Sequence, residues 1–468
     1  MASVKNLPKS ILKCIFDVSF QGPAGLPPQR DEERRILTQV CRKWRRVILS
    51  TPTFWSTFGI IQWEVWRPQN LLKLAQEFFG RSGDTPLAIY LRGSLHSSLG
   101  HGILEFIIRP HARRVWFLSC WVTKQGLRTL IGPGRIDFPI LRSIDVTIIY
   151  SPDDTIASHI PIKGSICLDR FQHLGPSLRQ LALRVLDGVH PADLGLQVPW
   201  GQFTRIDLEH TPIHADAFMR IIEQSLLLED GTFCINFALR SHDGRATTFR
   251  RISVPCLQRL HLRLIEPSLD ARIFGKPAMP VLEDLLVERG ELGRVIRDLT
   301  IYETFVFNAP IKYLTIAEYS LSMTQWLIPR FNHSPRLTYQ EMDGILRLTP
   351  NLTTLYLCPG VFMNALVLEK LATGEFLPVL EKLAVSSATG WDIICMVRRK
   401  NSESTSPGGS SAAHPVSLIQ LRLCIMRYGL DEEDKVALEG ALKALHLLYG
   451  YTFRHVDIPR RESQPLTF

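Results

Sequence analysis

The sequence predicts an α/β fold, in which a small N-terminal helical module is followed by a solenoid of parallel strands with helical or loop returns. The first observation is helical apolar spacing between residues 7 and 48. The second is a pattern, apolar-x-x-apolar-x-apolar, whose successive copies start 25 to 29 residues apart where no insertion intervenes. A strand with alternate apolar residues cannot bury its inner face alone, whereas stacked parallel copies bury these faces together.

Two N-terminal stretches have the apolar period of amphipathic helices. Pro8 suits a first helical position, and Pro52 disfavours helix at the residue before it, so the second helix is expected to end there. The apolar series are Ile11, Leu12, Ile15 and Phe16, then Ile36, Leu37, Val40, Trp44, Val47 and Ile48. The opposite face of the second helix is basic, with Arg34, Arg35, Arg42, Lys43, Arg45 and Arg46. Because three short helices make a poor core, we expect their apolar faces to seek a partner.

Three runs in this region resemble a known family. They read L-P-x-x-I-L-x-x-I-F from Leu7, V-C-R-K-W-R from Val40 and S-T-P-x-x-W from Ser50. The periodicity alone also fits an ordinary helical hairpin, but these runs resemble the F-box-like module of large fungal families, over residues 5–58. The resemblance implies binding to a Skp-type adaptor, and through it to the cullin of a ubiquitin ligase. The residues expected at the adaptor, some of which would instead form the internal core, are Leu7, Pro8, Ile11, Leu12, Ile15, Val40, Trp44 and Trp55.

The segment 21–30 departs from the resemblance, because it lengthens the connection between the two helices. Its Gly and Pro content predicts a surface loop. After the module, residues 68–80 are expected to be helical, and residues 81–91 to form a turn and then a strand.

The repeated pattern occupies most of the remaining chain. Its spacing resembles leucine-rich repeats, each a strand plus a return segment. The copies lie at Val115/Phe117, Leu141/Ile144/Val146, Leu178/Leu181/Leu183, Phe203/Ile206/Leu208, Ile235/Phe237, Leu257/Leu260/Leu262, Leu282/Leu285/Val287, Ile311/Leu314/Ile316, Leu352/Leu355/Leu357, Leu380/Leu383/Val385 and Leu418/Leu421/Leu423. A doubly wound α/β domain would also alternate strands and helices, but the short spacing and the lack of a phosphate-binding glycine loop favour the solenoid.

The repeats are expected to be irregular. The asparagine that usually follows the last apolar residue by three positions is absent, and Thr211, Ile265, Gly290, Tyr319 and Gly360 stand there, with only Cys120 fitting a substitute. Helices are expected at 216–228, 338–349 and 364–372, a flexible loop at 401–414, and a final helix from Asp431 towards Gly450 as a cap. The predicted domains are 1–58, the adaptor-binding module; 59–110, a connecting helix, strand and first atypical repeat; 111–458, the solenoid; and 459–468, a tail.

Composition narrows the function. The net charge of +9 is dispersed and forms no basic stripe with interleaved aromatics, so no nucleic acid is expected. No apolar run approaches the ~18 residues that span a bilayer, so no membrane is expected. None of the nine cysteines lies in a C-x-x-C pair, which suits a cytoplasmic and/or nuclear protein. His210 and His214 are separated by Pro212 and read as solvated loop residues. The absence of catalytic and metal-binding motifs predicts no enzyme, cofactor or metal.

The expected function is therefore substrate recognition in a Skp–cullin–F-box type ubiquitin ligase, and the alternative is a scaffold that works outside a ligase. A protein substrate of unknown identity is expected on the outward positions of the repeat strands, where fixed charges and aromatics alternate with the buried residues. These positions include Arg205, Asp207, Arg259, His261, Arg263, Asp284, Tyr313 and Tyr356.

Overall fold

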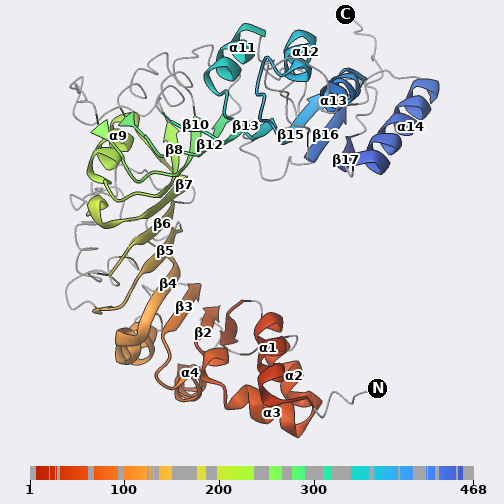
Figure 1. Ribbon diagram of the computed structural model, residues 1–468. Coiled ribbons are helices and arrows are strands. Elements are labelled where there is room, and N and C mark those ends of the chain that lie inside the picture. Colours follow the sequence, from red (N-terminus) through yellow and green to blue (C-terminus); the bar gives the residue numbers. More distant parts are fainter. Residues whose placement is uncertain are drawn as a thin grey trace, which may run out of the picture. The chain divides into compact units, whose positions relative to one another are not determined.

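The computed structural model describes residues 7–20, 22–26, 28, 32–61, 68–92, 100, 102–123, 127, 130, 136–149, 177–185, 198–236, 252–265, 277–289, 309–318, 339–357, 363–387, 391–403, 418, 420–426, 432–449 and 452–456. The chain divides into two compact units, residues 1–211 and residues 212–468, which we call unit 1 and unit 2. Both units are built from parallel strands with helices between them (Figure 1).

Unit 1 carries parallel strands whose order in space follows their order in the chain. Each strand pairs with the next in parallel register, which is the arrangement that the repeated sequence pattern predicts. The strands are β1 (Ala24–Leu26), β2 (Thr57–Ile61), β3 (Leu87–Arg92), β4 (Val115–Val122), β5 (Ser143–Ile148), β6 (Gln180–Val185) and β7 (Arg205–Ile213).

Unit 2 continues the same plan with β8 (Asp230–Asn236), β10 (Arg259–Ile265), β12 (Asp284–Arg289), β13 (Tyr313–Glu318), β14 (Thr354–Leu357), β15 (Lys382–Ser387), β16 (Gln420–Met426) and β17 (Thr452–Val456). A separate parallel pair joins β9 (Ile252–Ser253) to β11 (Pro277–Ala278). The register places one leucine of each motif directly beside the next, in the row Leu260, Leu285, Leu314, Leu355, Leu383 and Leu421. These leucines are buried, so the inner face of the sheet is a continuous apolar core.

The structure therefore has the large, open, all-parallel sheet that the repeats predict. Phe117, predicted to be an inner residue of its strand, was misassigned. An irregularity in the β3–β4 register places Phe117 beside Ala88, on the outward face, and the buried apolar residues of β4 are Val115, as predicted, and then Leu118, Cys120 and Val122. Such a bulge adds a residue to one strand and shifts the alternation by one position. Phe237, also predicted as an inner residue, lies outside the described residues.

The helices of unit 1 are α1 (Lys9–Ser19), α2 (Glu33–Val40), α3 (Arg42–Leu49), the 3₁₀ helix η2 (Pro52–Trp55), α4 (Pro68–Ser82), and the short turns η4 (Ile103–Ile108) and η5 (Arg109–Arg114). The single helix expected across residues 36–48 is broken at Cys41, whose backbone is extended at φ −159°. The Cys41 Sγ accepts the backbone N–H of Trp44 at 3.5 Å and so caps α3. The predicted end of this helix before Pro52 is confirmed.

Unit 2 has the helices α9 (Ala215–Gln224), α11 (Tyr339–Leu348), α12 (Ala365–Thr373), α13 (Trp391–Glu403) and α14 (Glu432–Tyr449). Gly374 ends α12 in the left-handed region at φ +75°, as its position in the sequence predicts. Three helices, α11, α12 and α13, lie on the same side of the neighbouring strands (Figure 1). The expected terminal cap is wrong, because β17 follows α14 and pairs with β16. Of the expected loop 401–414, residues 401–403 belong to α13 and the rest lies outside the described residues.

Candidate functional site

The N-terminal module has an aromatic core. Phe16 of α1 packs edge-on against Trp44 of α3, with ring centroids 5.1 Å apart, and lies 6.3 Å from Phe54. Phe20 adds a second edge contact to Phe54 at 5.0 Å. Such edge-to-face pairs add about 0.5–1.5 kcal/mol each beyond area burial. The three helices therefore do form a core, although a small one.

Arg34 was predicted on the solvated face of α2, and this prediction is wrong. Its guanidinium is buried; Nε donates to the Phe54 carbonyl at 3.0 Å and a terminal nitrogen donates to the Gly22 carbonyl at 3.2 Å. The same group lies 4.8 Å from the centre of the Phe20 ring and pairs with Glu32 at 3.6 Å. Burial lowers the pKa of Arg34, against the opposing effect of Glu32. Arg34 thus joins α2, the η2 turn and the inserted segment.

The inserted segment 21–30 was expected to be a surface loop, but it contains a strand. β1 pairs with β2, so that Ala24 lies beside Phe58 and Leu26 beside Ile60. Ala24 and Leu26 are buried. The module is therefore continuous with the first strands of the sheet, and the boundary expected at residue 58 falls inside β2.

A second aromatic cluster joins the module to α4. Trp55 packs edge-on against Phe78 at 4.8 Å, and Phe58 lies 5.0 Å from Phe79. The indole N–H of Trp55 donates to the Ile48 carbonyl at 2.9 Å, so α3 is tied to the same cluster. Trp55 therefore contributes to the stability of the module.

The predicted adaptor residues separate into two groups. Leu12 and Trp55 are buried, and Trp44 is half-buried against Phe16. Leu7 is half-buried and its carbonyl accepts the Lys43 ammonium at 2.7 Å. The remaining predicted residues, Pro8, Ile11, Ile15 and Val40, are exposed.

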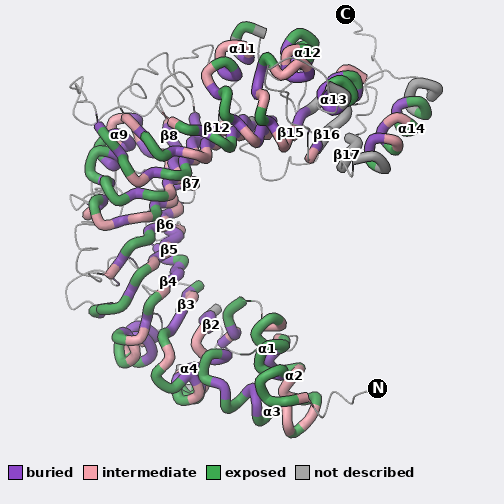
Figure 2. Tube along the Cα trace, viewed as in Figure 1, coloured by how far each residue is buried: buried purple, intermediate pink, exposed green. Residues whose placement is uncertain are grey.

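The exposed apolar residues on α1 and α2 form the first candidate site. Side-chain spacing of three or four places Ile11, Ile15 and Val18 on one face of α1, and Ile36 and Val40 on one face of α2. Their exposed fractions are 46%, 41%, 74%, 49% and 56%, respectively. In Figure 2 exposed residues cover much of both helices. Sequence periodicity assigned Ile36 and Val40 to the same apolar series as Val47 and Ile48, but the break at Cys41 separates the exposed pair Ile36 and Val40 from the buried pair Val47 and Ile48.

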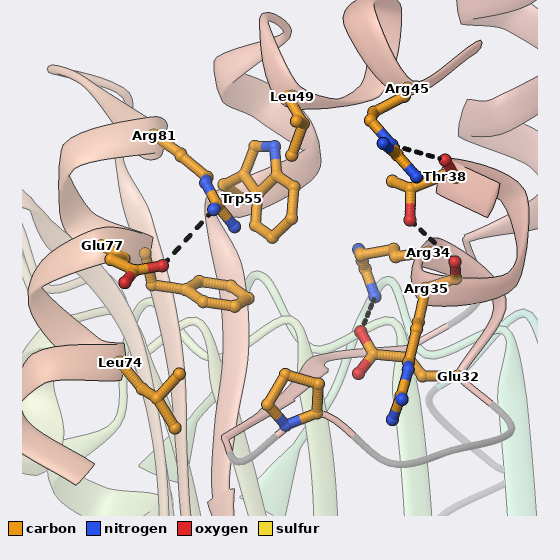
Figure 3. A pocket seen from close by; sticks show the side chains of 12 residues that line it. Glu32, Arg34, Arg35, Thr38, Arg45, Leu49, Trp55, Leu74, Glu77 and Arg81 are labelled. Carbon is orange, nitrogen blue, oxygen red and sulfur yellow. Dashed lines mark hydrogen bonds and ion pairs between the residues drawn. The ribbon is translucent and has the colours of Figure 1, made fainter. Parts of the chain in front are cut away.

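A cleft lies between α2–α3 and α4, with a volume of about 480 Å³ (Figure 3). Its lining residues come from both sides and are Pro28, Glu32, Arg34, Arg35, Thr38, Arg45, Leu49, Trp55, Leu74, Glu77, Phe78 and Arg81. The Arg81 guanidinium stacks 4.7 Å above the Trp55 ring and pairs with Glu77 at 3.4 Å. Sequence reasoning missed this cleft, because its two sides are brought together by the Trp55–Phe78 contact.

The outward strand face of unit 1 carries a charge cluster. Arg184 of β6 pairs with Asp145 of β5 at 3.0 Å and with Asp207 of β7 at 3.7 Å. The predicted residue Arg205 is exposed at the start of β7, beside Gln180. Asp207 is thus held by a neighbour, and Arg205 is exposed.

Aromatic residues extend this outward face and were not among the predicted site residues. Tyr90 of β3 lies 5.1 Å from Phe117 of β4, and the Arg92 guanidinium lies 4.7 Å above the exposed ring of Trp121. Burial raises the pKa of Tyr90, and Asp145 raises it further. Phe117 and Trp121 are four residues apart and so lie on the same strand face, but the sequence pattern placed Phe117 inward, because it did not include the irregularity that follows Val115.

In unit 2 the outward positions are connected by ion pairs across strands. Arg259 of β10 pairs with Asp230 of β8 at 3.0 Å. Arg263 was expected to be accessible but is buried, and it holds Glu288 of β12 at 2.8 Å. His261 lies 3.5 Å from the same carboxylate. Burial raises the pKa of Glu288, but His261 and Arg263 together lower it more, so the net pKa lies below its usual value.

The other predicted residues of unit 2 lie on the same strand face. Asp284 stands directly beside Arg259 and Tyr313 in the strand register. Burial raises the pKa of Asp284. The attraction of Arg259 lowers this pKa but only partly offsets the effect of burial. Tyr313 is exposed and Tyr356 is half-buried. Unit 2 therefore brings together Arg259, His261, Asp284, Tyr313 and Tyr356 on one face, with Arg263 below the surface.

Of the two histidines singled out from the sequence, His210 is not a loop residue, because it belongs to β7. His214 does lie in the connection between β7 and α9, where it caps α9 by accepting the Asp216 backbone N–H at 3.1 Å through Nδ1. Within the described ranges no group of three or more His, Cys, Asp or Glu side chains could hold a metal. The helices that the structure describes include none with the length and apolar character needed to cross a bilayer.

Comparisons with known proteins add no family to these observations. No family model matches the chain, and no curated protein matches it by sequence. The functional assignment therefore depends on the residues and geometry described above.

Proposed function

We propose that this chain is the substrate-recognition subunit of a Skp–cullin–F-box type ubiquitin ligase. Its N-terminal helices bind the Skp-type adaptor, and the outward face of its repeat strands binds a protein substrate. The protein performs no chemistry itself and acts by bringing a substrate close to the transfer machinery. The alternative is an F-box-like scaffold with leucine-rich repeats that works outside a ligase.

The observation that carries the proposal is the apolar surface on α1 and α2. Ile11 and Ile15 occur in the F-box-like run and have exposed fractions of 46% and 41%. Fully burying such a side chain contributes about 1.5–3 kcal/mol, so a partner that covers several of them gains free energy of binding. The repeat strands support the second half of the proposal, because a polar and aromatic strand face suits protein recognition.

The experiment compares adaptor binding between matched variants. Ile11→Glu combined with Ile15→Glu should lower the affinity for a Skp-type adaptor about 100-fold or more, because two apolar anchors are replaced by charges. Val436→Glu is the control, since Val436 is an apolar residue of α14 that is 68% exposed. Undiminished adaptor binding by the double variant would exclude α1 as the docking surface. Co-purification distinguishes the two functions, because a ligase subunit brings adaptor and cullin, and a scaffold brings the adaptor alone or neither.

The substrate half is tested separately. Arg259→Ala combined with Tyr313→Ala removes two exposed side chains without touching the buried Arg263–Glu288 pair. Substrates recovered with the wild-type chain under proteasome inhibition should be lost, while adaptor binding should persist. Full substrate capture by this variant would move recognition away from this strand face.

A further inference from the structure

The cleft between α2–α3 and α4 has an excess of positive charge. Four arginines and two glutamates line it. Arg34 pairs with Glu32 at 3.6 Å and Arg81 pairs with Glu77 at 3.4 Å, so these charges balance. Arg35 and Arg45 remain, and among the described residues neither has a carboxylate within ion-pair distance. The cleft therefore presents two separate guanidinium groups, each of which can bind an anionic group (Figure 3).

The side chain of Arg45 is partly fixed. Arg45 donates through Nε to the Thr38 carbonyl at 2.9 Å, which joins α3 to the end of α2 and orients the guanidinium (Figure 3). The bond uses Nε alone and leaves the terminal nitrogens for a ligand. Terminal N–H groups of arginine match the two oxygens of a carboxylate, and such charged hydrogen bonds are stronger than neutral ones.

The rest of the cleft is apolar. Trp55 and Phe78 are buried side chains that face it, and Leu49 and Leu74 line it from α3 and α4. A ligand that fits both halves needs a carboxylate and an apolar group close together. Single-stranded nucleic acid fits less well, because stacking requires an open aromatic face and the Arg81 guanidinium covers the Trp55 ring at 4.7 Å.

We propose that this cleft binds a segment of a partner protein in which two acidic side chains flank an aromatic or aliphatic one. Arg35 and Arg45 each bind one carboxylate, and Leu49, Leu74 and Phe78 bind the apolar side chain. This site differs from the apolar surface of α1 and α2, and the inference does not depend on the proposed ligase function. It would add a second attachment point on the same module.

The test uses the full chain and two labelled peptides, Gly-Ser-Glu-Phe-Asp-Leu-Gly and its uncharged counterpart Gly-Ser-Gln-Phe-Asn-Leu-Gly. Fluorescence anisotropy should show that the acidic peptide binds at least about 10-fold more tightly, and that salt weakens this binding. Arg35→Gln combined with Arg45→Gln should reduce the affinity about 10-fold or more. The control is Arg42→Gln combined with Arg46→Gln, which removes the same charge from exposed α3 positions outside the cleft and should change the affinity less than about threefold.

Leu49→Gln keeps the charge of the cleft and removes one apolar contact, so it should lower the affinity for the acidic peptide several-fold. Four results would overturn the proposal: no binding of the acidic peptide at about 1 mM, equal affinity for both peptides, equal loss in the two double variants, or tighter binding of an oligothymidine that depends on Arg35 and Arg45. Circular dichroism checks that each variant folds, and a folded variant with any of these results counts against the cleft.

Discussion

Lys400 offers a quantitative test of the helix packing in unit 2. It lies on α13 with its side chain buried, and its ammonium is 3.4 Å from the Leu371 carbonyl of α12. Burial lowers the pKa of Lys400 from 10.5 to about 8. The folded chain therefore disfavours the charged form of this side chain.

The lowered pKa of Lys400 makes the free energy of unfolding depend on pH, because the folded and unfolded chains bind the proton with different affinity. Between pH 8 and 10.5 the unfolded chain binds the proton more tightly than the folded chain, so stability rises with pH across this window. Below about pH 8 the full penalty applies. The difference between 10.5 and about 8 corresponds to about 3 kcal/mol at 1.36 kcal/mol for each pKa unit. A variant that removes the ammonium also loses its bond to the Leu371 carbonyl, and this loss offsets the gain in stability by about 1 kcal/mol.

Lys400→Met keeps a long, flexible chain and removes the charge. We expect it to raise the free energy of unfolding by about 1–3 kcal/mol at pH 7, and to lose this advantage as the pH approaches 10. Guanidinium-induced unfolding at several pH values gives the free energy of unfolding of wild type and of Lys400→Met. The difference between the two values removes the contribution of titrating groups that both proteins share. Lys443→Met, at an exposed position of α14, should stay within about 0.5 kcal/mol of wild type. A destabilised Lys400→Met, or a difference that does not change with pH, would refute the burial of a charged ammonium here.

Two further predictions concern stability. Leu260→Asp should lower the free energy of unfolding by about 3 kcal/mol or more, because Leu260 is buried in the leucine row between β8 and β12; thermal melting monitors it, and an unchanged melt would contradict the core assignment. Arg34→Gln should lower the free energy of unfolding by about 3 kcal/mol, since it leaves the Gly22 and Phe54 carbonyls without this donor. Proteolysis of unit 1 should then cut near Gly22 faster than in wild type, and equal cutting rates would count against the arginine's joining role.

The strands were predictable because their cause is local. Alternation with a period of two places every second side chain on one face, and a repeat of fixed length places equivalent leucines in register, as in Leu285 beside Leu314. Both ends of α12 were predictable for the same reason, since Asn364 at its start and Gly374 at its end are local signals. In each case the decisive interactions lie within one repeat or between adjacent ones.

The features that sequence reasoning missed depend on distant partners. Arg34 reads as a surface residue until the carbonyls of Gly22 and Phe54 are placed around it. Thr211 stands where a repeat asparagine was expected, and its hydroxyl donates to the Leu183 carbonyl at 2.6 Å, a bond to the preceding repeat. A substitute for the missing asparagine was therefore present, but only the fold shows which backbone group it reaches.

The continuity between module and sheet determines how the proposed adaptor site should be tested. Two connections cross the boundary expected at residue 58: the β1–β2 pairing and the Trp55–Phe78 contact. Deleting residues 1–58 would uncover apolar residues of β2 and α4, including the buried Ile60 and Phe78, so loss of binding in such a deletion would not separate misfolding from a lost surface. Substitutions on the exposed face of α1 leave both connections in place. A rigid connection also means that a partner on α1 would be oriented relative to the first strands, which is what delivery of a strand-bound substrate to a ligase requires.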